Sequence, residues 1–228
     1  MSFQKSLHTI VSGKDLTEDE MMAAMTEIME GKVVDSQFAA FLTALQLKHE
    51  TVPEIVGAAR VMRAKAEKVR VNASHIVDTC GTGGDGADTF NISTAVSFVV
   101  AGADITVAKH GNRAVSSKSG SADVLKCLGV NIDASLSTVE RCIEEVGIGF
   151  LFAPLMHKAM KHAAKVRKEL GFRTIFNLLG PLTNPAHAHG QVLGVYDSRW
   201  VNPLAAVSYT HLRAHETDSY LVCRLLLE

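Results

Sequence analysis

The stretch DTCGTGGDG, residues 78–86, follows the short apolar segment His75–Val77 and precedes a longer apolar run at residues 91–102. Glycines let the backbone turn tightly and point several N–H groups at one place, an arrangement that binds anions. The residues from Asn91 are helix-like, so the amides and dipole of a helix start face the same region. Taken alone, the pattern is equally well explained by a turn that only connects a strand to a helix.

Two later loops favour the anion-binding interpretation. KHGNR, residues 109–113, follows an apolar run at residues 105–108, and SSKSGSAD, residues 116–123, comes soon after. Lys109 can bring a point charge to a phosphate, and Arg113 a planar fork. The glycine spacing is not that of the dinucleotide fingerprint, and the Gly-Lys-Ser/Thr of the mononucleotide loop is absent. We therefore expect a strongly anionic ligand held by a different kind of phosphate site.

Hydrophobic patterning predicts an α/β fold preceded by a small helical domain. In residues 1–70, Thr17 with Glu20 and Thr51 with Glu54 form capping patterns, and Asp35 can cap a helix between them. From His75 onward short apolar runs alternate with helical patterns, which predicts a mostly parallel sheet flanked by helices. The expected strands are 76–78, 105–108, 149–152 and 191–196, and the expected helices are 91–102, 121–128, 137–146 and 156–170.

Composition limits the classes of function. A hydrophobic content of 47% with 21% charged residues is typical of a globular protein, and the net charge of −1 gives no overall attraction to nucleic acid or to a membrane surface. No apolar run approaches the roughly 20 residues of a membrane span. Four cysteines without C-x-x-C spacing predict reduced thiols of the cytoplasm. Cys80 lies beside the glycine turn, and we interpret it as a packing residue because no motif places a base next to it.

Five segments together resemble a known family: GTGGDG (81–86), NIST (91–94), KHGNR (109–113), GSAD (120–123) and RTIFNLLGPLTNP (173–185). In this order they closely resemble the anthranilate phosphoribosyltransferases of tryptophan biosynthesis, and the resemblance runs to about Val207. It implies transfer of the phosphoribosyl group of 5-phosphoribosyl 1-pyrophosphate to the amine of anthranilate, with release of pyrophosphate. It also implies the fold of the nucleoside phosphorylases and phosphoribosyltransferases, a requirement for Mg²⁺ and a cytoplasmic homodimer.

The resemblance and the loop chemistry assign the donor site. Backbone amides of the glycine turn are expected to hold the pyrophosphate, with Asp85 near the ribose or the metal shell. Hydroxyls and an amide at the next helix start suit phosphate oxygens, although plain helix capping explains them too. The resemblance makes Ser93 a magnesium ligand. Asp123 is explained as well by the helix dipole as by function. The expected donor-binding residues are Gly81, Thr82, Gly83, Gly84, Asp85, Thr89, Asn91, Ser93, Thr94, Lys109 and Ser121, with Ser119 as a substitute for Ser121.

The acceptor is a small aromatic acid, and its carboxylate needs a cation. On a helix over residues 156–170, His157, Met160, Ala164 and Arg167 would share a stripe about 80° wide at roughly 100° per residue. The resemblance assigns the carboxylate to Arg167, with Gly81, His110, Asn112 and His157 along the acceptor path. A packing role explains His157 nearly as well. Lys158, Lys161, Lys165 and Lys168 are expected to form a solvated face. An aryl amine is neutral at cellular pH, so we assign no catalytic residue and expect rate to come from positioning and electrostatics.

The expected domains are 1–70, a helical domain for dimerisation and the acceptor, and 71–207, an α/β domain for the donor. The dimer prediction rests on the apolar residues Met21, Met25, Phe38, Phe41 and Leu45 and on the family's habit. Residues 208–228 break the rhythm of strands and helices and do not continue the family's pattern. We interpret them as a non-native tail on a C-terminally truncated chain, with a natural, divergent C-terminal helix as the alternative. Family members continue past this point and carry an Asp-Glu metal-binding pair there, so this chain is expected to be an inactive fragment.

Two other functions fit parts of the sequence. A nucleoside phosphorylase would use phosphate and a base, but Arg167 and residues 173–185 favour the transferase. A non-catalytic nucleic-acid-binding relative would need a basic surface, and the near-neutral charge argues against it.

Overall fold

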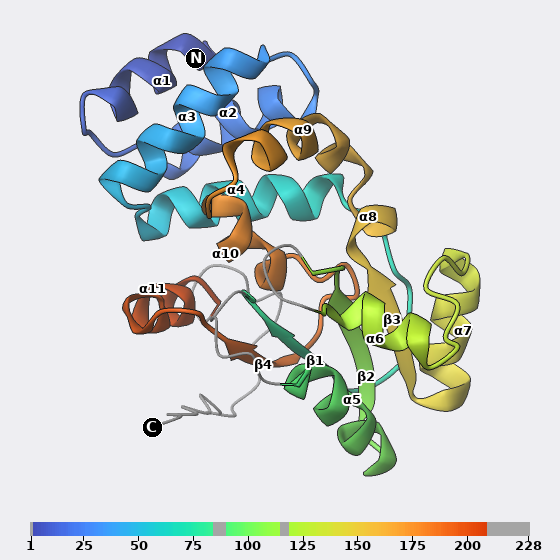
Figure 1. Ribbon diagram of the computed structural model, residues 1–228. Coiled ribbons are helices and arrows are strands. Elements are labelled where there is room, and N and C mark those ends of the chain that lie inside the picture. The colour runs from blue at the N-terminus through green and yellow to red at the C-terminus, as the bar shows by residue number, and fades with distance from the viewer. Residues whose placement is uncertain (1, 84–89, 115–118, 209–228) are drawn as a thin grey trace. The chain divides into compact units, whose positions relative to one another are not determined.

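The computed structural model describes residues 2–83, 90–114 and 119–208 (Figure 1). The predictions for Gly84, Asp85 and Thr89, and for the tail after Ser208, lie outside these residues. The described chain forms two compact units. The first contains the residues up to Ala66, His157–Thr183 and the residues from Val201, and the second contains Glu67–Met156 and Asn184–Trp200. The sequence predicted one boundary near residue 70, whereas the chain returns to the helical unit because residues 157–183 pack their helices on α3 and α4.

The helical unit is built from α1 (Phe3–Val11), α2 (Glu18–Met29), α3 (Asp35–Lys48) and α4 (Val52–Lys65), followed later in the chain by α9 (Lys161–Leu170), α10 (Ile175–Leu182) and α11 (Val201–Ala206). The capping box of α2 is confirmed, since Glu20 N–H donates to Thr17 Oγ1 at 3.2 Å and Thr17 N–H to Glu20 Oε2 at 3.0 Å. At α4, the amide of Thr51 donates to Glu54 Oε2 at 2.8 Å, as expected. Asp35 is the first residue of α3, and Val34 occupies the cap position that was expected for Asp35.

The apolar residues proposed as a dimer surface are in fact core residues of the helical unit. Met21, Met25, Phe41 and Leu45 are 0% exposed and Phe38 is 2% exposed. Burial of such side chains stabilises a helical unit by roughly 1.5–3 kcal/mol each, which accounts for their spacing without a second subunit. These residues therefore no longer support the prediction of a dimer, although the helices that carry them form as expected.

The second unit carries a four-stranded parallel sheet in the order β3-β2-β1-β4 (Figure 1). Its elements are β1 (Ile76–Gly81), α5 (Ile92–Gly102), β2 (Thr106–Gly111), α6 (Ser121–Cys127), α7 (Leu136–Val146), β3 (Ile148–Phe152), α8 (Ala153–Met156), β4 (Gly190–Gly194) and a 3₁₀ turn at Ser198–Trp200. The α/β prediction is confirmed. Ile76, Ala108, Ile143 and Leu151 meet in one core cluster between sheet and helices. Carboxyl ends of β1 and β2 lie at one edge, so both predicted phosphate loops begin there.

Helix α5 packs on the sheet through small polar residues. Thr94 and Ser97 are 2% and 1% exposed, whereas Phe98 and Val99 are 43% and 72% exposed. The apolar character that predicted this helix therefore lies largely on its outer face.

The predicted continuous helix over residues 156–170 is wrong. Helix α8 ends at Met156, His157 has non-helical dihedrals (φ −119°, ψ 64°), and a 3₁₀ turn at Lys158–Met160 precedes α9. The break turns the imidazole of His157 inward, where it is 5% exposed and interacts with the backbone of Thr183. His157 and Arg167 therefore do not share one helical stripe. Lys158, Lys161, Lys165 and Lys168 are exposed, as expected.

Candidate functional site

The first part of the candidate site is the turn at the end of β1. Gly83 has φ +65°, a left-handed conformation that glycine adopts without strain, and apart from its chain neighbours no atom of the described residues lies within 4 Å of the position a Cβ would take. A Cβ on Gly81 would lie 3.1 Å from the carbonyl oxygen of Gly194 in β4. The turn is thus held against β4 and open on its outer side, which suits the approach of an anion to the backbone.

Thr82 differs from the expectation. Its N–H donates to Gly194 O at 2.9 Å, and its hydroxyl accepts the N–H of Tyr196 at 3.0 Å. The backbone donor that was expected to hold a pyrophosphate is used within the protein. Thr82 therefore fixes the turn to β4 in this structure, because its amide and its hydroxyl both bond to that strand and its extension.

The start of α5 is a side-chain cap. Asn91 Oδ1 accepts the Thr94 hydroxyl at 2.7 Å, the Thr94 N–H at 3.3 Å and the Ser93 hydroxyl at 3.3 Å. The capping interpretation is therefore correct for Asn91 and Thr94. Ser93 is half-buried, and its hydroxyl oxygen also lies 3.3 Å from Lys109 Nζ. The hydroxyl oxygen of Ser93 therefore already interacts with the Lys109 ammonium. It lies at the edge of the sheet where the loops after β1 and β2 begin.

Lys109 lies inside the unit, 2% exposed on β2. Its ammonium donates to the carbonyl oxygen of Thr79 at 2.5 Å and approaches the hydroxyls of Ser93 (3.3 Å) and Thr79 (3.5 Å). Burial lowers the pKa of Lys109, and the neighbouring Cys80 and Asp78 act against that shift. The charge that the sequence analysis assigned to direct phosphate contact is thus placed beneath the end of β1.

The loop after β2 is closed by Asp123. Its Oδ2 accepts the N–H of Gly120 at 2.9 Å and of Ala114 at 3.0 Å, and these backbone bonds hold the pKa of Asp123 below its usual range. Arg113 pairs with the same carboxylate at 3.4 Å. Of the two explanations left open, the structure supports a capping role for Asp123. Ser121 follows as the first residue of α6, beside Gly111, and Ser119 is exposed.

Two acceptor candidates also belong to this unit. His110 is 3% exposed, and its N–H donates to Asp78 Oδ1 at 3.1 Å. Asn112 is exposed, and its carbonyl oxygen accepts the N–H of Ala122 at 3.2 Å. Cys80 is not a candidate nucleophile, because burial raises the pKa of its thiol well above the ordinary value.

Arg167 and His157 belong to the helical unit. Arg167 is half-buried on α9, its guanidinium lies 5.0 Å from the centre of the Phe176 ring, and burial lowers its pKa to about 10. It is still protonated at neutral pH, and no carboxylate of the described residues pairs with it. A half-buried cation of this kind is suited to a ligand's carboxylate.

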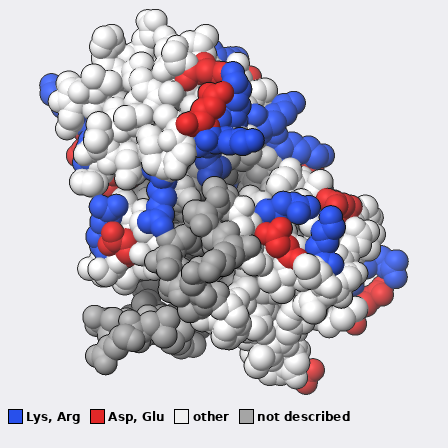
Figure 2. Space-filling model, in the orientation of Figure 1, with Lys and Arg blue, Asp and Glu red and all other residues white. Residues whose placement is uncertain are grey.

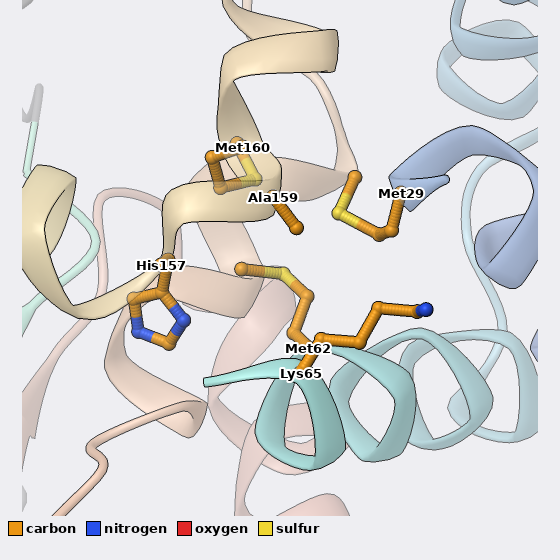
Figure 3. Close-up of a pocket in the computed structure, with 6 residues that line it drawn as sticks. All are labelled: Met29, Met62, Lys65, His157, Ala159 and Met160. Atoms are coloured by element: carbon orange, nitrogen blue, oxygen red, sulfur yellow. The ribbon is translucent and has the colours of Figure 1, made fainter. Parts of the chain in front are cut away.

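His157 has a different setting. Burial lowers its pKa to about 4, so the imidazole is neutral at pH 7. It borders a cavity of about 10 Å³, close to the least that holds one water, together with Met29, Met62, Lys65, Ala159 and Met160. Figure 3 shows Met29 of α2 and Met62 of α4 reaching toward Ala159 and Met160. The packing role that the sequence analysis left open fits these surroundings.

Charge on the helical unit is mixed. Figure 2 shows Lys and Arg side chains gathered around α9 with acidic side chains among them. Lys165 pairs with Asp35 at 2.5 Å, and Glu30 pairs with Lys65 at 3.0 Å and Lys32 at 2.7 Å. Paired, exposed charges of this kind do not make a uniform basic surface for nucleic acid.

Neither a clustered metal site nor a membrane span is present in the described part of the chain. Across residues 2–83, 90–114 and 119–208, no three His, Cys, Asp or Glu side chains are grouped to hold a metal ion. None of the helices in these ranges is long and apolar enough to cross a membrane.

Comparison with known proteins identifies both units. A model of the glycosyl transferase family, helical bundle domain, matches residues 4–66, and a model of the glycosyl transferase family, a/b domain, matches residues 73–217. The chain belongs to this glycosyl transferase family. Within the family it is similar to anthranilate phosphoribosyltransferases, as the sequence motifs predicted.

The similarity is high over most of this chain. The protein from Anaeromyxobacter sp. (strain K) is 62% identical over 204 residues, and that from Alkaliphilus metalliredigens is 61% identical, each alignment covering 90% of this chain and 60% of the relative. The chain thus spans about 60% of the length of the curated relatives it matches.

Solved structures agree with this assignment. The Thermus thermophilus enzyme has a TM-score of 0.84 at 47% identity, and the match covers 89% of this chain and 62% of that enzyme. A Saccharomyces cerevisiae enzyme solved in complex with PRPP and Mg has a TM-score of 0.82 at 30% identity, and the match covers 92% of this chain and 63% of that enzyme.

Proposed function

We propose that the protein transfers the phosphoribosyl group of 5-phosphoribosyl 1-pyrophosphate (PRPP) to anthranilate in tryptophan biosynthesis, in the cytoplasm. The observation that carries this proposal is the identity of about 60% with anthranilate phosphoribosyltransferases over 90% of the chain. A nucleoside phosphorylase is disfavoured, because the relatives and solved structures described above carry the name anthranilate phosphoribosyltransferase.

The α/β unit would bind the donor. The turn at Gly83 brings its backbone to the pyrophosphate, the dipole at the start of α5 adds positive potential, and Lys109 adds further positive potential from beneath β1. Ser121, at the start of α6, offers a further hydroxyl. We infer that Thr82, Asn91 and Thr94 shape this site rather than contact the donor, because their hydrogen bonds are made within the protein.

Magnesium fits the chemistry of this edge only in part. Bound to pyrophosphate, the ion would neutralise charge on the leaving group. Ser93 is the described residue that would hold it, since a hydroxyl oxygen suits a hard cation. A Saccharomyces cerevisiae relative was solved with PRPP and Mg, which supports the requirement in this family.

Arg167 would bind the carboxylate of anthranilate. Its planar guanidinium can form two parallel bonds to a carboxylate, and the Phe176 ring against it limits its movement. His110 and Asn112 follow β2 and would line the acceptor path. In the reaction the amine nitrogen forms a bond to C1 of the ribose, the C1–O bond breaks, and pyrophosphate leaves with the electron pair. The amine then loses a proton to solvent, so no protein base is needed.

Isothermal titration of PRPP with Mg²⁺ into this chain tests the donor site. Gly83→Val is expected to weaken binding at least about tenfold, because a β-branched residue strains a backbone at φ +65°. Gly102→Val is the matched control, since Gly102 ends α5 and its Cβ would meet no atom within 4 Å. Equal affinities of both variants and the unmodified chain would place the donor elsewhere.

A further inference from the structure

The ladder of paired residues between the two central strands, β1 and β2, ends before the strands do. Residues of β1 and β2 pair at Ile76↔Thr106 and Val77↔Val107, while in the described residues β1 pairs with β4 as far as Gly81↔Gly194. β2 likewise pairs with β3 as far as Gly111↔Phe152. Past Val77 and Val107 the ladder between β1 and β2 is thus open, although both strands continue to the two loops of the candidate site.

Side chains bridge this opening. Asp78 of β1 accepts the N–H of His110 on β2 at 3.1 Å, and Lys109 of β2 donates to the carbonyl oxygen of Thr79 on β1. Asn184 donates to the carbonyl oxygen of Ala108 at 2.8 Å. These bridges satisfy buried backbone groups that the missing ladder bonds would otherwise leave without partners.

Among these side chains, Asp78 forms hydrogen bonds to both strands that flank β1. It is 0% exposed, and its second oxygen accepts Gln191 Nε2 of β4 at 3.2 Å, so one carboxylate joins three strands. Burial raises the pKa of Asp78 to about 6, against the opposing effects of Asn184, His110, Lys109 and Gln191. A buried carboxylate is costly, and apolar residues of similar size often replace such groups without loss of stability. Its presence here calls for a role in the site.

We propose that Asp78 is a positioning residue that sets the distance between the glycine turn after β1 and the His110–Asn112 loop after β2. Its carboxylate accepts the N–H of His110, so the length of the aspartate side chain fixes the distance between the backbone of β1 at Asp78 and that of β2 at His110. The proposal rests on the proposed function, in which the first loop binds the donor and the second lines the acceptor path. Asp78 itself touches neither substrate.

The test combines amide hydrogen exchange with titration of PRPP and Mg²⁺ on the whole chain. Asp78→Ala is expected to lower protection of the His110 amide at least tenfold and to weaken PRPP binding at least tenfold. The Val107 amide, which donates to Gly147 O at 2.8 Å, should keep its protection. Asp133→Ala, an exposed aspartate of the same unit, is the matched control and should change neither measurement.

Asp78→Asn and Asp78→Glu separate position from charge. Asparagine keeps an oxygen for the His110 amide without the charge, although it loses the acceptor for Gln191 Nε2, so PRPP affinity and His110 protection should stay within threefold of the unmodified chain. Glutamate keeps the charge at a greater length, so PRPP affinity should fall tenfold or more. These two variants decide the question if Asp78→Ala does not fold.

The proposal is overturned if Asp78→Glu binds PRPP as tightly as the unmodified chain, or if Asp78→Asn loses as much PRPP affinity and His110 protection as Asp78→Ala. It is also overturned if Asp78→Ala leaves the His110 amide protected. Absence of PRPP binding by the unmodified chain would instead contradict the proposed function, while His110 exchange would still test the bridge.

Discussion

Gly120→Ala is expected to be among the most damaging single-methyl additions in the α/β unit. A Cβ at Gly120 would lie 2.3 Å from Ala114 N, 2.5 Å from Arg113 C and 2.7 Å from Asn112 O. All three are backbone atoms, so no side chain can rotate away. The dihedral angles of Gly120 (φ −96°, ψ 172°) suit any residue, and the effect is therefore purely steric.

The magnitude follows from these contacts. Ordinary contact begins near 3.4 Å, so the loop must move by about 1 Å. That movement costs about 1–3 kcal/mol in overpacking. It also stretches the two bonds from Ala114 and Gly120 to Asp123, each worth about 1.5–3 kcal/mol as a bond to a charged group. A net loss of about 3 kcal/mol corresponds to a fall in Tm of roughly 6–12 °C for a chain of this length.

Urea unfolding followed by circular dichroism measures this loss, with Gly102→Ala as the control. Gly102 ends α5 and a methyl there meets nothing within 4 Å, so alanine should be neutral or stabilise by about 0.5–1 kcal/mol. A Gly120→Ala protein as stable as the unmodified chain would show that Asp123 does not hold the loop in the described conformation.

Three further predictions concern other parts of the chain. Arg167→Ala should weaken anthranilate binding, followed by its fluorescence, by about 10- to 150-fold for a lost charge-assisted bond of about 1.5–3 kcal/mol; Arg167→Lys should also be impaired, and the exposed neighbour variant Lys168→Ala should not. Unchanged affinity in Arg167→Ala would remove the carboxylate assignment. Val99→Lys should reduce self-association in light scattering, because Val99 is 72% exposed on the apolar face of α5, and an unaltered mass would show that this face does not associate. Burial lowers the pKa of His157 from its ordinary value near 6.5 to about 4, so its contribution to stability is present above pH 6.5 and is lost as the pH falls toward 4. His157→Gln should flatten the dependence of unfolding free energy on pH in that window, and an unaltered dependence would show that another group causes it.

The fold was predictable where local chemistry decides the structure. Thr17 with Glu20 specified a helix start that the structure contains, and the alternation of apolar runs and helical patterns predicted the parallel sheet. The break at His157 was not predictable, because residues 156–170 have helical periodicity, and the buried imidazole interacts with Thr183, which is distant in the chain. Nor could the sequence show that residues 157–183 join the helical unit, since that depends on contacts distant in the chain.

The candidate site was predictable as chemistry and less so as geometry. Motifs identified Gly83 and Lys109, but only the structure shows that Lys109 is buried under Thr79 and that Thr82 is bonded to β4. Asp78 is the first residue of the glycine stretch, and the motifs assigned it no role. An acidic residue inside an otherwise apolar strand is the signal that could have identified it, because such a group requires buried donors.

Turnover is the most direct test of the central claim. The relative from Anaeromyxobacter sp. (strain K) is longer than the matched region, so the measurement uses a hybrid in which its remaining residues follow Val207 of this chain. PRPP, anthranilate and Mg²⁺ are mixed with the hybrid, and loss of anthranilate fluorescence is followed together with pyrophosphate release. We predict equal amounts of anthranilate consumed and pyrophosphate formed, with no cleavage of nucleosides in the presence of phosphate. A folded hybrid that cleaves nucleosides, or that leaves anthranilate unchanged while the relative itself consumes it, would contradict the account.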